Sequence, residues 1–180
     1  GFVSRGLGDV YKRQGVYRER INPYYGGTSN TKRIVYQAAE NNEVWIKGSE
    51  IIKGWKKYEG NIWMVELDNK MFGDFNPYQE IVEGDWLIND YGRDHHLGEV
   101  YLNGIALYEN DSIDKLLVEK PLPRANNQES SKYQWFCKSD KKKTIIYANF
   151  KGLDPNVEIV EINERPAVLL PKKTPINYRT

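Results

Sequence analysis

The chain has 180 residues, of which 39% are hydrophobic and 28% charged, and its formal net charge is +1. This length allows one well-packed hydrophobic core or two small ones, while the near-zero charge provides no field that would attract nucleic acid or an anionic membrane surface. No apolar run approaches the length of a membrane span, and the single cysteine excludes an intrachain disulfide, which leaves a cytoplasmic and a secreted location both open.

The beginning of the chain does not match the pattern that follows it. The run Gly6-Leu-Gly-Asp-Val-Tyr-Lys-Arg-Gln14 resembles a translated adapter tract that recurs at the ends of open reading frames from environmental sequencing. Residues 1–14 are therefore expected to be non-native and are left out of the fold prediction. Residues 175–180 stop inside what has the pattern of a new strand, so we expect a fragment of a longer protein with both ends cut.

Residues 15–52 contain short β-prone runs at nearly even spacing. These runs are Val16–Ile21, Arg33–Tyr36 and Val44–Ile46, and turn-rich or polar corners separate them. Strands of this length with no helical period between them favour a β-solenoid, in which each rung buries its aliphatic side chains against the next rung. A single rung is not stable alone, so several are expected.

From residue 53 the pattern changes to longer strands. The Asn103-Gly104 pair between two β-prone runs is a strong hairpin signal, and Ser112–Glu119 fits at most one short helix. Cys137 lies in an alternating run, which predicts a packed thiol and not a nucleophile. The other expected strands favour a small antiparallel sandwich or a strongly curled sheet; they are Ile62–Leu67, Tyr133–Cys137 and Thr144–Phe150.

Short β-prone runs at nearly even spacing occur again near the end of the chain. Val157–Ile162 alternates between apolar and polar residues, and Ala167–Leu170 and Ile176–Tyr178 follow. We therefore expect an all-β protein in which residues 53–157 are a sandwich inserted between two parts of one coil, residues 15–52 and 158–180. Insertions of this kind are tolerated at solenoid corners, where the chain leaves and re-enters at nearby points.

Several segments resemble one group of proteins. Gly15-Val-Tyr-Arg-Glu19, Ile34–Glu40, Val44–Glu50 and Gly54-Trp55 resemble the opening rungs of right-handed parallel β-helix proteins that act on carbohydrates. With the insert after Trp55, the chain is most similar to the β-xylosidases of glycoside hydrolase family 120.

The resemblance implies the first rungs of a right-handed parallel β-helix, interrupted by an antiparallel β-sandwich. It also implies hydrolysis of a plant-type oligosaccharide, with a xylo-oligosaccharide as the expected substrate and no cofactor. The two catalytic carboxylates of the family come from later rungs, so neither maps onto a residue of this chain.

One loop-like stretch, Gly84–His96, concentrates polar and aromatic side chains and includes both histidines. Binding groups gather on loops of a rigid β scaffold, and a sugar site needs hydrogen-bonding groups beside a stacking ring. The candidate substrate-binding residues are Trp86, Arg93, Asp94, His95 and His96. The competing interpretation is a surface loop whose side chains bond to one another.

A metal site is not expected in this stretch. Adjacent residues such as His95 and His96 usually point apart, and neither Cys nor Glu occurs at zinc-like spacing. A second aromatic stretch, Phe72–Tyr78, is interpreted as packing beneath a loop, with Asp74 and Asn76 closing the turn through backbone bonds.

Three other functions remain open at this point. A β-helix polysaccharide lyase would use a Lys or Arg base, often with calcium, and would release an unsaturated product. A non-catalytic module would bind glycans without cleaving them, and a cell-surface or capsid-associated β-helix would have a longer solenoid and no pocket. A homo-oligomer also remains open, whereas no nucleic-acid or membrane partner is expected.

Overall fold

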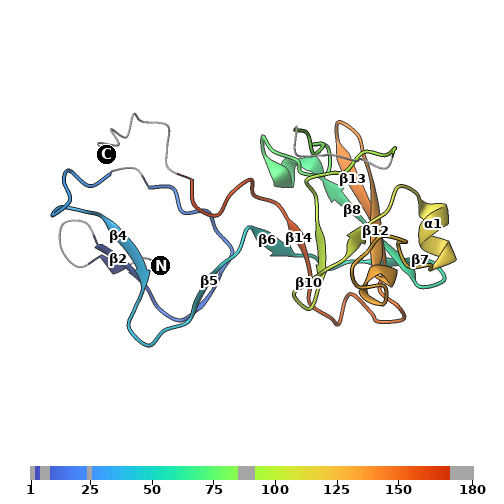
Figure 1. The fold of residues 1–180 in the computed structure, drawn as a ribbon, viewed down its shortest axis with the longest axis horizontal. Helices are drawn as coiled ribbons and strands as arrows, with labels where there is room; N and C mark the ends of the chain where they lie inside the picture. The colour runs from blue at the N-terminus through green and yellow to red at the C-terminus, as the bar shows by residue number, and fades with distance from the viewer. Residues whose placement is uncertain (1–2, 5–8, 24–25, 85–91, 171–180) are drawn as a thin grey trace. The chain divides into compact units, whose positions relative to one another are not determined.

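A computed structural model describes residues 3–4, 9–23, 26–84 and 92–170. The chain divides into two compact units, which are described separately (Figure 1). The smaller unit consists of residues 1–48 and 167–180, and the larger unit consists of residues 49–166. Both are built from β-structure, and the larger unit contains one α-helix.

The smaller unit is built from short strands, two pairs of which run parallel. β1 (Val3–Ser4) pairs antiparallel with β2 (Asp9–Lys12), and β2 pairs parallel with β4 (Val35–Ala38). β3 (Gly15–Tyr17) pairs parallel with β5 (Val44–Ile46). Parallel pairing requires a long connection between the paired strands; here β3 lies between β2 and β4 in the chain, and β4 lies between β3 and β5.

A third parallel contact joins the beginning of the smaller unit to its last segment. Ile21 and Leu169 form a parallel bridge. The Ile21 amide donates to the Val168 carbonyl at 2.8 Å, and the Leu170 amide donates to the Ile21 carbonyl at 3.1 Å. Ile21 is buried. Residues that follow the larger unit in sequence therefore return alongside residues that precede it.

Part of residues 1–14, the tract expected to be non-native, forms β2 in the smaller unit. Lys12, the last residue of β2, has a buried side chain. Its ammonium pairs with the Glu19 carboxylate and lies 3.8 Å from the centroid of the Tyr17 ring. A buried ammonium requires such compensation, so β2 contributes to this unit through both backbone and side-chain contacts.

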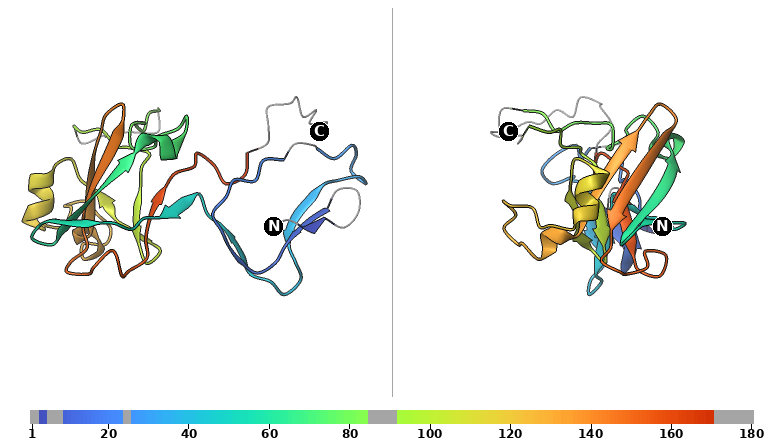
Figure 2. Two further views of the ribbon diagram at one scale, coloured as in Figure 1. Left: turned by 180° about the vertical axis from the view of Figure 1, so that it is seen from behind. Right: turned by 90° about the vertical axis from the view of Figure 1, so that its right-hand side faces the viewer.

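The larger unit contains a five-stranded sheet of mixed direction (Figures 1 and 2). Its order is β11 (Tyr108–Glu109), β12 (Gln134–Ser139), β13 (Lys143–Asn149), β8 (Ile62–Asp68) and β7 (Lys56–Glu59). The pairing of β11 with β12 is parallel and the others are antiparallel. The expected strands Tyr133–Cys137 and Thr144–Phe150 correspond to β12 and β13, which form an antiparallel hairpin.

A second sheet has four strands, all antiparallel. Its order is β10 (Ile105–Ala106), β9 (Val100–Leu102), β14 (Val160–Asn163) and β6 (Ser49–Ile51). The β9–β10 hairpin turns at Asn103 and Gly104, whose φ angles are 52° and 83°. Positive φ at both central positions is typical of the type I′ turn that this dipeptide favours, as the sequence predicted.

The boundaries of the larger unit differ from the expected 53–157. The alternation in Val157–Ile162 was assigned to the coil, but residues 160–163 form β14, which pairs antiparallel with β6 and β9. Val160 and Ile162 are completely buried. Alternation identifies a half-buried strand without identifying its partner, and here the partners belong to the insert. The sheets of the chain are consequently mostly antiparallel.

The main core of the larger unit lies between its two sheets. Alternate residues of β8, β9, β12, β13 and β14 point inward, as a sandwich requires. The five-stranded sheet contributes Val65, Leu67, Trp135, Cys137, Ile146 and Ala148, and the four-stranded sheet contributes Val100, Leu102, Val160 and Ile162. Burial raises the pKa of the Cys137 thiol to about 12, which agrees with the expected packed thiol and excludes a thiolate nucleophile at neutral pH.

The outer face of the five-stranded sheet is covered in part by α1 (Ile113–Val118) (Figure 2). The Ser112 hydroxyl caps its first turn, and Leu116 is fully buried against Ile62 and Tyr147. Two short 3-10 helices, Asn69–Phe72 and Ser130–Lys132, also lie in the described part of this unit.

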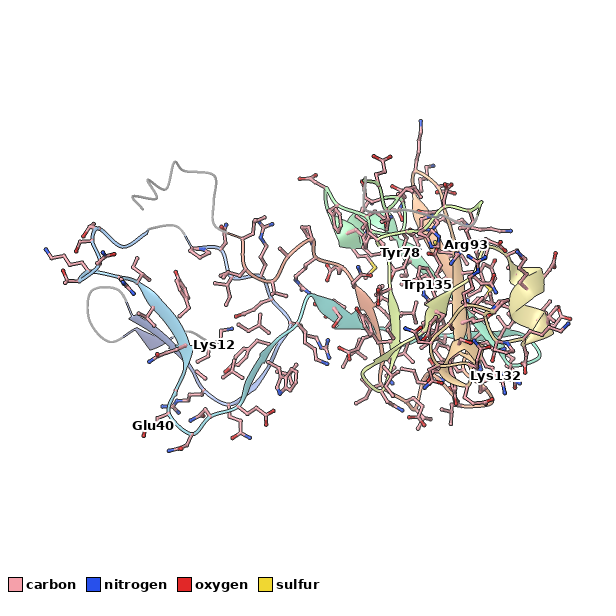
Figure 3. All side chains as sticks on the ribbon, viewed as in Figure 1. Lys12, Glu40, Tyr78, Arg93, Lys132 and Trp135 are labelled. Atoms are coloured by element: carbon pink, nitrogen blue, oxygen red, sulfur yellow. The ribbon has the colours of Figure 1, made fainter. Side chains whose placement is uncertain are left out.

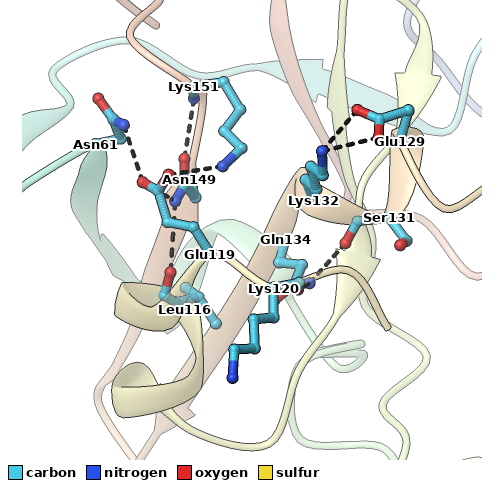
Figure 4. A network of polar contacts seen from close by, with 10 residues as sticks. All are labelled: Asn61, Leu116, Glu119, Lys120, Glu129, Ser131, Lys132, Gln134, Asn149 and Lys151. Atoms are coloured by element: carbon cyan, nitrogen blue, oxygen red, sulfur yellow. Dashed lines mark hydrogen bonds and ion pairs between the residues drawn. The ribbon is translucent and has the colours of Figure 1, made fainter. Parts of the chain in front are cut away.

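A network of polar contacts fixes the end of α1 (Figure 4). Glu119, in the left-handed conformation that ends the helix, accepts hydrogen bonds from Asn61 and Asn149 at 2.9 Å. It also pairs with the Lys151 ammonium at 2.7 Å. These contacts, led by those with Lys151 and Asn149, lower the pKa of Glu119 to about 2.

Candidate functional site

The segment that carries the predicted site is held to the chain that precedes it. Ile81 and His96 form an antiparallel bridge. The Val82 amide donates to the His95 carbonyl at 2.7 Å, and the Leu97 amide donates to the Glu80 carbonyl at 2.9 Å. The two backbone hydrogen bonds of this bridge fix residues 95–97, so their side chains project from an ordered ribbon.

The centre of this site is a residue that the sequence analysis did not select, Glu109. It ends β11, the edge strand of the five-stranded sheet, and its side chain is only 12% exposed. One carboxylate oxygen lies 2.6 Å from Nδ1 of His96, and the other accepts the backbone N–H of His96 at 3.2 Å. A single carboxylate thus binds both the ring and the backbone of one histidine.

Arg93 approaches the same residue. Its Nη2 donates to the Glu109 backbone carbonyl at 3.1 Å, and its Nη1 lies 3.8 Å from Oε2 of Glu109. Nη1 is buried and has no hydrogen-bond partner among the residues that the structure describes. Trp135 is the register partner of Glu109 across the β11–β12 pair. Arg93 and Trp135 are both labelled in Figure 3 and belong to the same unit. The guanidinium therefore retains hydrogen-bonding capacity for a further acceptor.

The remaining predicted residues have different surroundings. Asp94 is exposed, and its side chain makes no hydrogen bond or ion pair within the described ranges. His95 is partly buried and engages Val82 through its carbonyl. Trp86 lies outside the described residues. The structure thus brings together two of the predicted residues, Arg93 and His96, through Glu109.

A weak sequence signal for Glu109 existed. It lies between the buried residues Leu107 and Asn110, in a β-prone run. A carboxylate that is mostly buried needs a cation or hydrogen-bond donors, but the sequence does not show which donors supply them, because Arg93 and His96 belong to another segment.

These side chains suit hydroxyl recognition more than metal binding. A guanidinium only donates hydrogen bonds, a carboxylate only accepts them, and an imidazole can do either. Within the described ranges, no group of three or more His, Cys, Asp or Glu side chains could hold a metal ion.

In the same part of the chain, every helix is too short or too polar to cross a bilayer.

Comparison with known proteins decides the family. Residues 52–162 match the insertion domain of glycoside hydrolase 120. The chain belongs to this family. Arg93, His96 and Glu109 all fall within the matched residues, so the candidate site lies in the part of this chain that matches the insertion domain. The similarity to family 120 that the sequence motifs suggested is confirmed at the level of the family.

A solved structure extends the match beyond the insertion domain. The structure of XylC in complex with xylose superposes on this family 120 chain with a TM-score of 0.88 and 43% sequence identity. The match covers 98% of this chain and 29% of XylC, so the chain spans less than a third of that protein's length. The comparison with curated proteins gives no match.

Proposed function

We propose that the chain is part of a glycoside hydrolase that cleaves a xylo-oligosaccharide. The observation that carries the proposal is the 43% identity to XylC, whose structure contains xylose, across 98% of this chain. Retaining hydrolysis needs two carboxyl groups about 5–5.5 Å apart, one ionised and one protonated. In this proposal both come from later rungs of the parent protein.

We also propose that the smaller unit forms the first rungs of a right-handed parallel β-helix. The parallel pairs β2–β4 and β3–β5 and the parallel bridge between Ile21 and Leu169 support this architecture. In a β-helix each strand lies parallel to its equivalent in the next rung, and the large insert leaves the coil at one corner.

The insertion domain, in this proposal, holds the sugar through Trp86, Arg93, Asp94 and one or both of His95 and His96. Two observations support the role. Nη1 of Arg93 is buried without a partner among the described residues, and Asp94 is exposed with an acceptor-only side chain. Asp94 can therefore accept a hydrogen bond from a sugar hydroxyl, and the Arg93 guanidinium keeps donor capacity next to Glu109.

The charges of the site favour a neutral sugar over an anionic one. The Arg93 guanidinium already faces the Glu109 carboxylate, and the neighbouring Asp94 adds a second negative charge. An incoming uronate would therefore meet a cation that already faces a carboxylate, so it would gain less from Arg93 than from an unpaired guanidinium. This balance supports a xylose-based substrate more than the substrate of a polysaccharide lyase.

The test uses the full-length parent protein with xylo-oligosaccharides. Free xylose should appear in the digest, and Trp86→Ala and His96→Ala should each weaken substrate binding about tenfold or more, which corresponds to about 1.4 kcal/mol. Asp114→Asn, an exposed change on α1, is the control and should leave turnover unchanged.

Other products would identify the rival functions. An ultraviolet-absorbing unsaturated product would indicate a lyase, and binding without cleavage would indicate a non-catalytic module. If Trp86→Ala and His96→Ala both leave sugar affinity and turnover unchanged, the proposed role of the insertion domain is wrong.

A further inference from the structure

We infer that Glu109 is a positioning residue for His96: it fixes the tautomer and orientation of the imidazole so that Nε2 can accept a hydrogen bond from a sugar hydroxyl. This inference rests on the proposed function, because it assumes that the segment around His96 contacts the sugar. It assigns a function to Glu109, which was not among the predicted site residues, and it assigns the role of hydrogen-bond acceptor to Nε2 of His96.

The geometry around the carboxylate carries the inference. Oε1 of Glu109 lies 2.6 Å from Nδ1 of His96, and Oε2 accepts the His96 amide at 3.2 Å. The two oxygens of one carboxylate therefore tie the ring to its own backbone. Rotation of the ring would break the shorter of these contacts, so the side chain is held in one orientation.

The chemistry of the two groups then assigns the proton. An ionised carboxylate only accepts hydrogen bonds, so a bond of 2.6 Å requires that Nδ1 of His96 carry hydrogen. In the neutral imidazole the other nitrogen, Nε2, is then an acceptor. No residue in the described ranges bonds Nε2, and the His96 side chain is 22% exposed.

Arg93 completes the arrangement. Its two terminal nitrogens contact the backbone carbonyl and the carboxylate of Glu109 at 3.1 and 3.8 Å. A mostly buried carboxylate is stable only with such compensation, so Arg93 and His96 together keep Glu109 in place. The result is a donor, Nη1 of Arg93, and an acceptor, Nε2 of His96, organised by one residue.

The tautomer can be measured directly. The sequence contains two histidines, so a long-range ¹H–¹⁵N spectrum of the ¹⁵N-labelled 180-residue chain contains two imidazole systems, and His96→Ala assigns them. At a pH where His96 is neutral, we expect the Nδ1–H form in the unmodified chain. Glu109→Ala should convert it to a mixture in which Nε2–H dominates, as in a histidine side chain exposed to water, while Glu129→Ala, at an exposed acid, should change nothing.

The affinity for xylose provides the second readout, in the full-length protein. Glu109→Ala should weaken xylose binding about tenfold, and Glu109→Gln should weaken it less, since an amide oxygen still accepts from Nδ1. A His96 tautomer that stays Nδ1–H in Glu109→Ala would overturn the inference. If Glu109→Ala does not fold, as judged by near-ultraviolet circular dichroism, Glu109→Met takes its place, because it keeps the length of the side chain and removes the acceptor, and a His96 that stays Nδ1–H in this variant would overturn the inference.

The two readouts separate this inference from the proposed function. If Glu109→Ala changes the tautomer and His96→Ala leaves xylose affinity intact, Glu109 positions His96 but the segment is not the sugar site. If His96→Ala weakens binding while Glu109→Ala changes neither tautomer nor affinity, the sugar site stands and the positioning role is wrong.

Discussion

At the residue scale, Tyr78 shows how tightly the sandwich is packed. The side chain is 1% exposed, and its ring lies 5.7 Å from the ring centroids of both Phe72 and Trp135. Its hydroxyl donates to the Glu99 carbonyl at 2.7 Å. Burial is the largest cause that raises the pKa of this hydroxyl well above its usual value, so it stays protonated and acts as a structural hydrogen-bond donor.

Gly98 is the residue that makes room for this ring. A Cβ at Gly98 would lie 2.4 Å from Cδ1 and 2.5 Å from Cε1 of Tyr78, so the ring would have to move. We predict that Gly98→Ala lowers the free energy of unfolding by about 1–3 kcal/mol, the usual cost of overpacking. Urea unfolding followed by fluorescence measures the change.

A double-mutant cycle isolates the cause. In a Tyr78→Leu background the ring is absent, so Gly98→Ala should cost distinctly less than in the unmodified chain. Equal costs in both backgrounds would mean that Gly98 is required for a reason other than its contact with Tyr78.

At the element scale, α1 is held to the sheet by one face. Leu116 is fully buried in the cluster with Ile62 and Tyr147, whereas the adjacent Leu117 is 36% exposed. We predict that Leu116→Ala lowers the free energy of unfolding by about 2–5 kcal/mol. Leu117→Ala is the matched control and should change it by about 0.5 kcal/mol or less. Similar losses for the two variants in thermal or urea unfolding would contradict the packing described.

The Glu119 network provides a second element-scale prediction, because it joins the end of α1 to β13 through Asn149 and to Asn61, the residue before β8. The pKa of Glu119 falls from its usual 4.5 to about 2 in the folded chain. Ionised Glu119 therefore stabilises the fold above pH 4.5, and this contribution disappears as the pH falls toward 2. Glu119→Gln should lower the free energy of unfolding by about 1–2 kcal/mol at pH 7, an estimate reduced for partial exposure.

The difference in free energy of unfolding between Glu119→Gln and the unmodified chain should become progressively smaller as the pH is lowered. Urea unfolding at pH 7 and at pH 3 measures the two differences. Glu129 forms an exposed ion pair with Lys132 (Figure 4), so Glu129→Gln should cost about 0–0.5 kcal/mol at pH 7. A Glu119→Gln deficit that is as large at pH 3 as at pH 7 would contradict the assignment.

At the scale of the whole molecule, the larger unit is closed by the strands at which the chain enters and leaves it. β6 and β14 are neighbours in one sheet, and Arg165 pairs with Glu50 at 2.5 Å. The Asn156 side chain accepts from the Gly54 and Trp55 amides and donates to the Trp55 carbonyl, all at 2.9 Å. The two ends of the insert are therefore fastened to each other.

We predict that residues 49–166 fold as an independent domain. An excised polypeptide of these residues should unfold cooperatively on heating and retain a near-ultraviolet circular dichroism signal, because it contains both sheets. Residues 53–157, the boundaries expected from the sequence, lack β6 and β14 and should not fold stably. A cooperative transition for 53–157 that matches that of 49–166 would refute this account.

Local features of the fold could be predicted from the sequence. The Asn103-Gly104 turn, the β12–β13 hairpin and the single short helix depend on turn chemistry and side-chain periodicity within a few residues. The resemblance to family 120 came from the opening motif, from Gly15 to Trp55, together with the insert that follows it, and the opening motif is also a local pattern of residues. The Asx bond of Asn76 to the Tyr78 amide, at 3.0 Å, is another local feature that was foreseen.

Partners distant in sequence required the tertiary structure. The alternation of Val157–Ile162 identified a strand, but only the folded chain showed that β14 pairs with β6 and β9 inside the insert. In the same way, the sequence by itself determined that Arg93 and His96 belong to a polar segment, and the structure decided that Glu109 organises both. The physical reason is common to both cases: periodicity and residue type describe what a segment can bury or bond, whereas the packing of the whole chain decides which distant segment it meets.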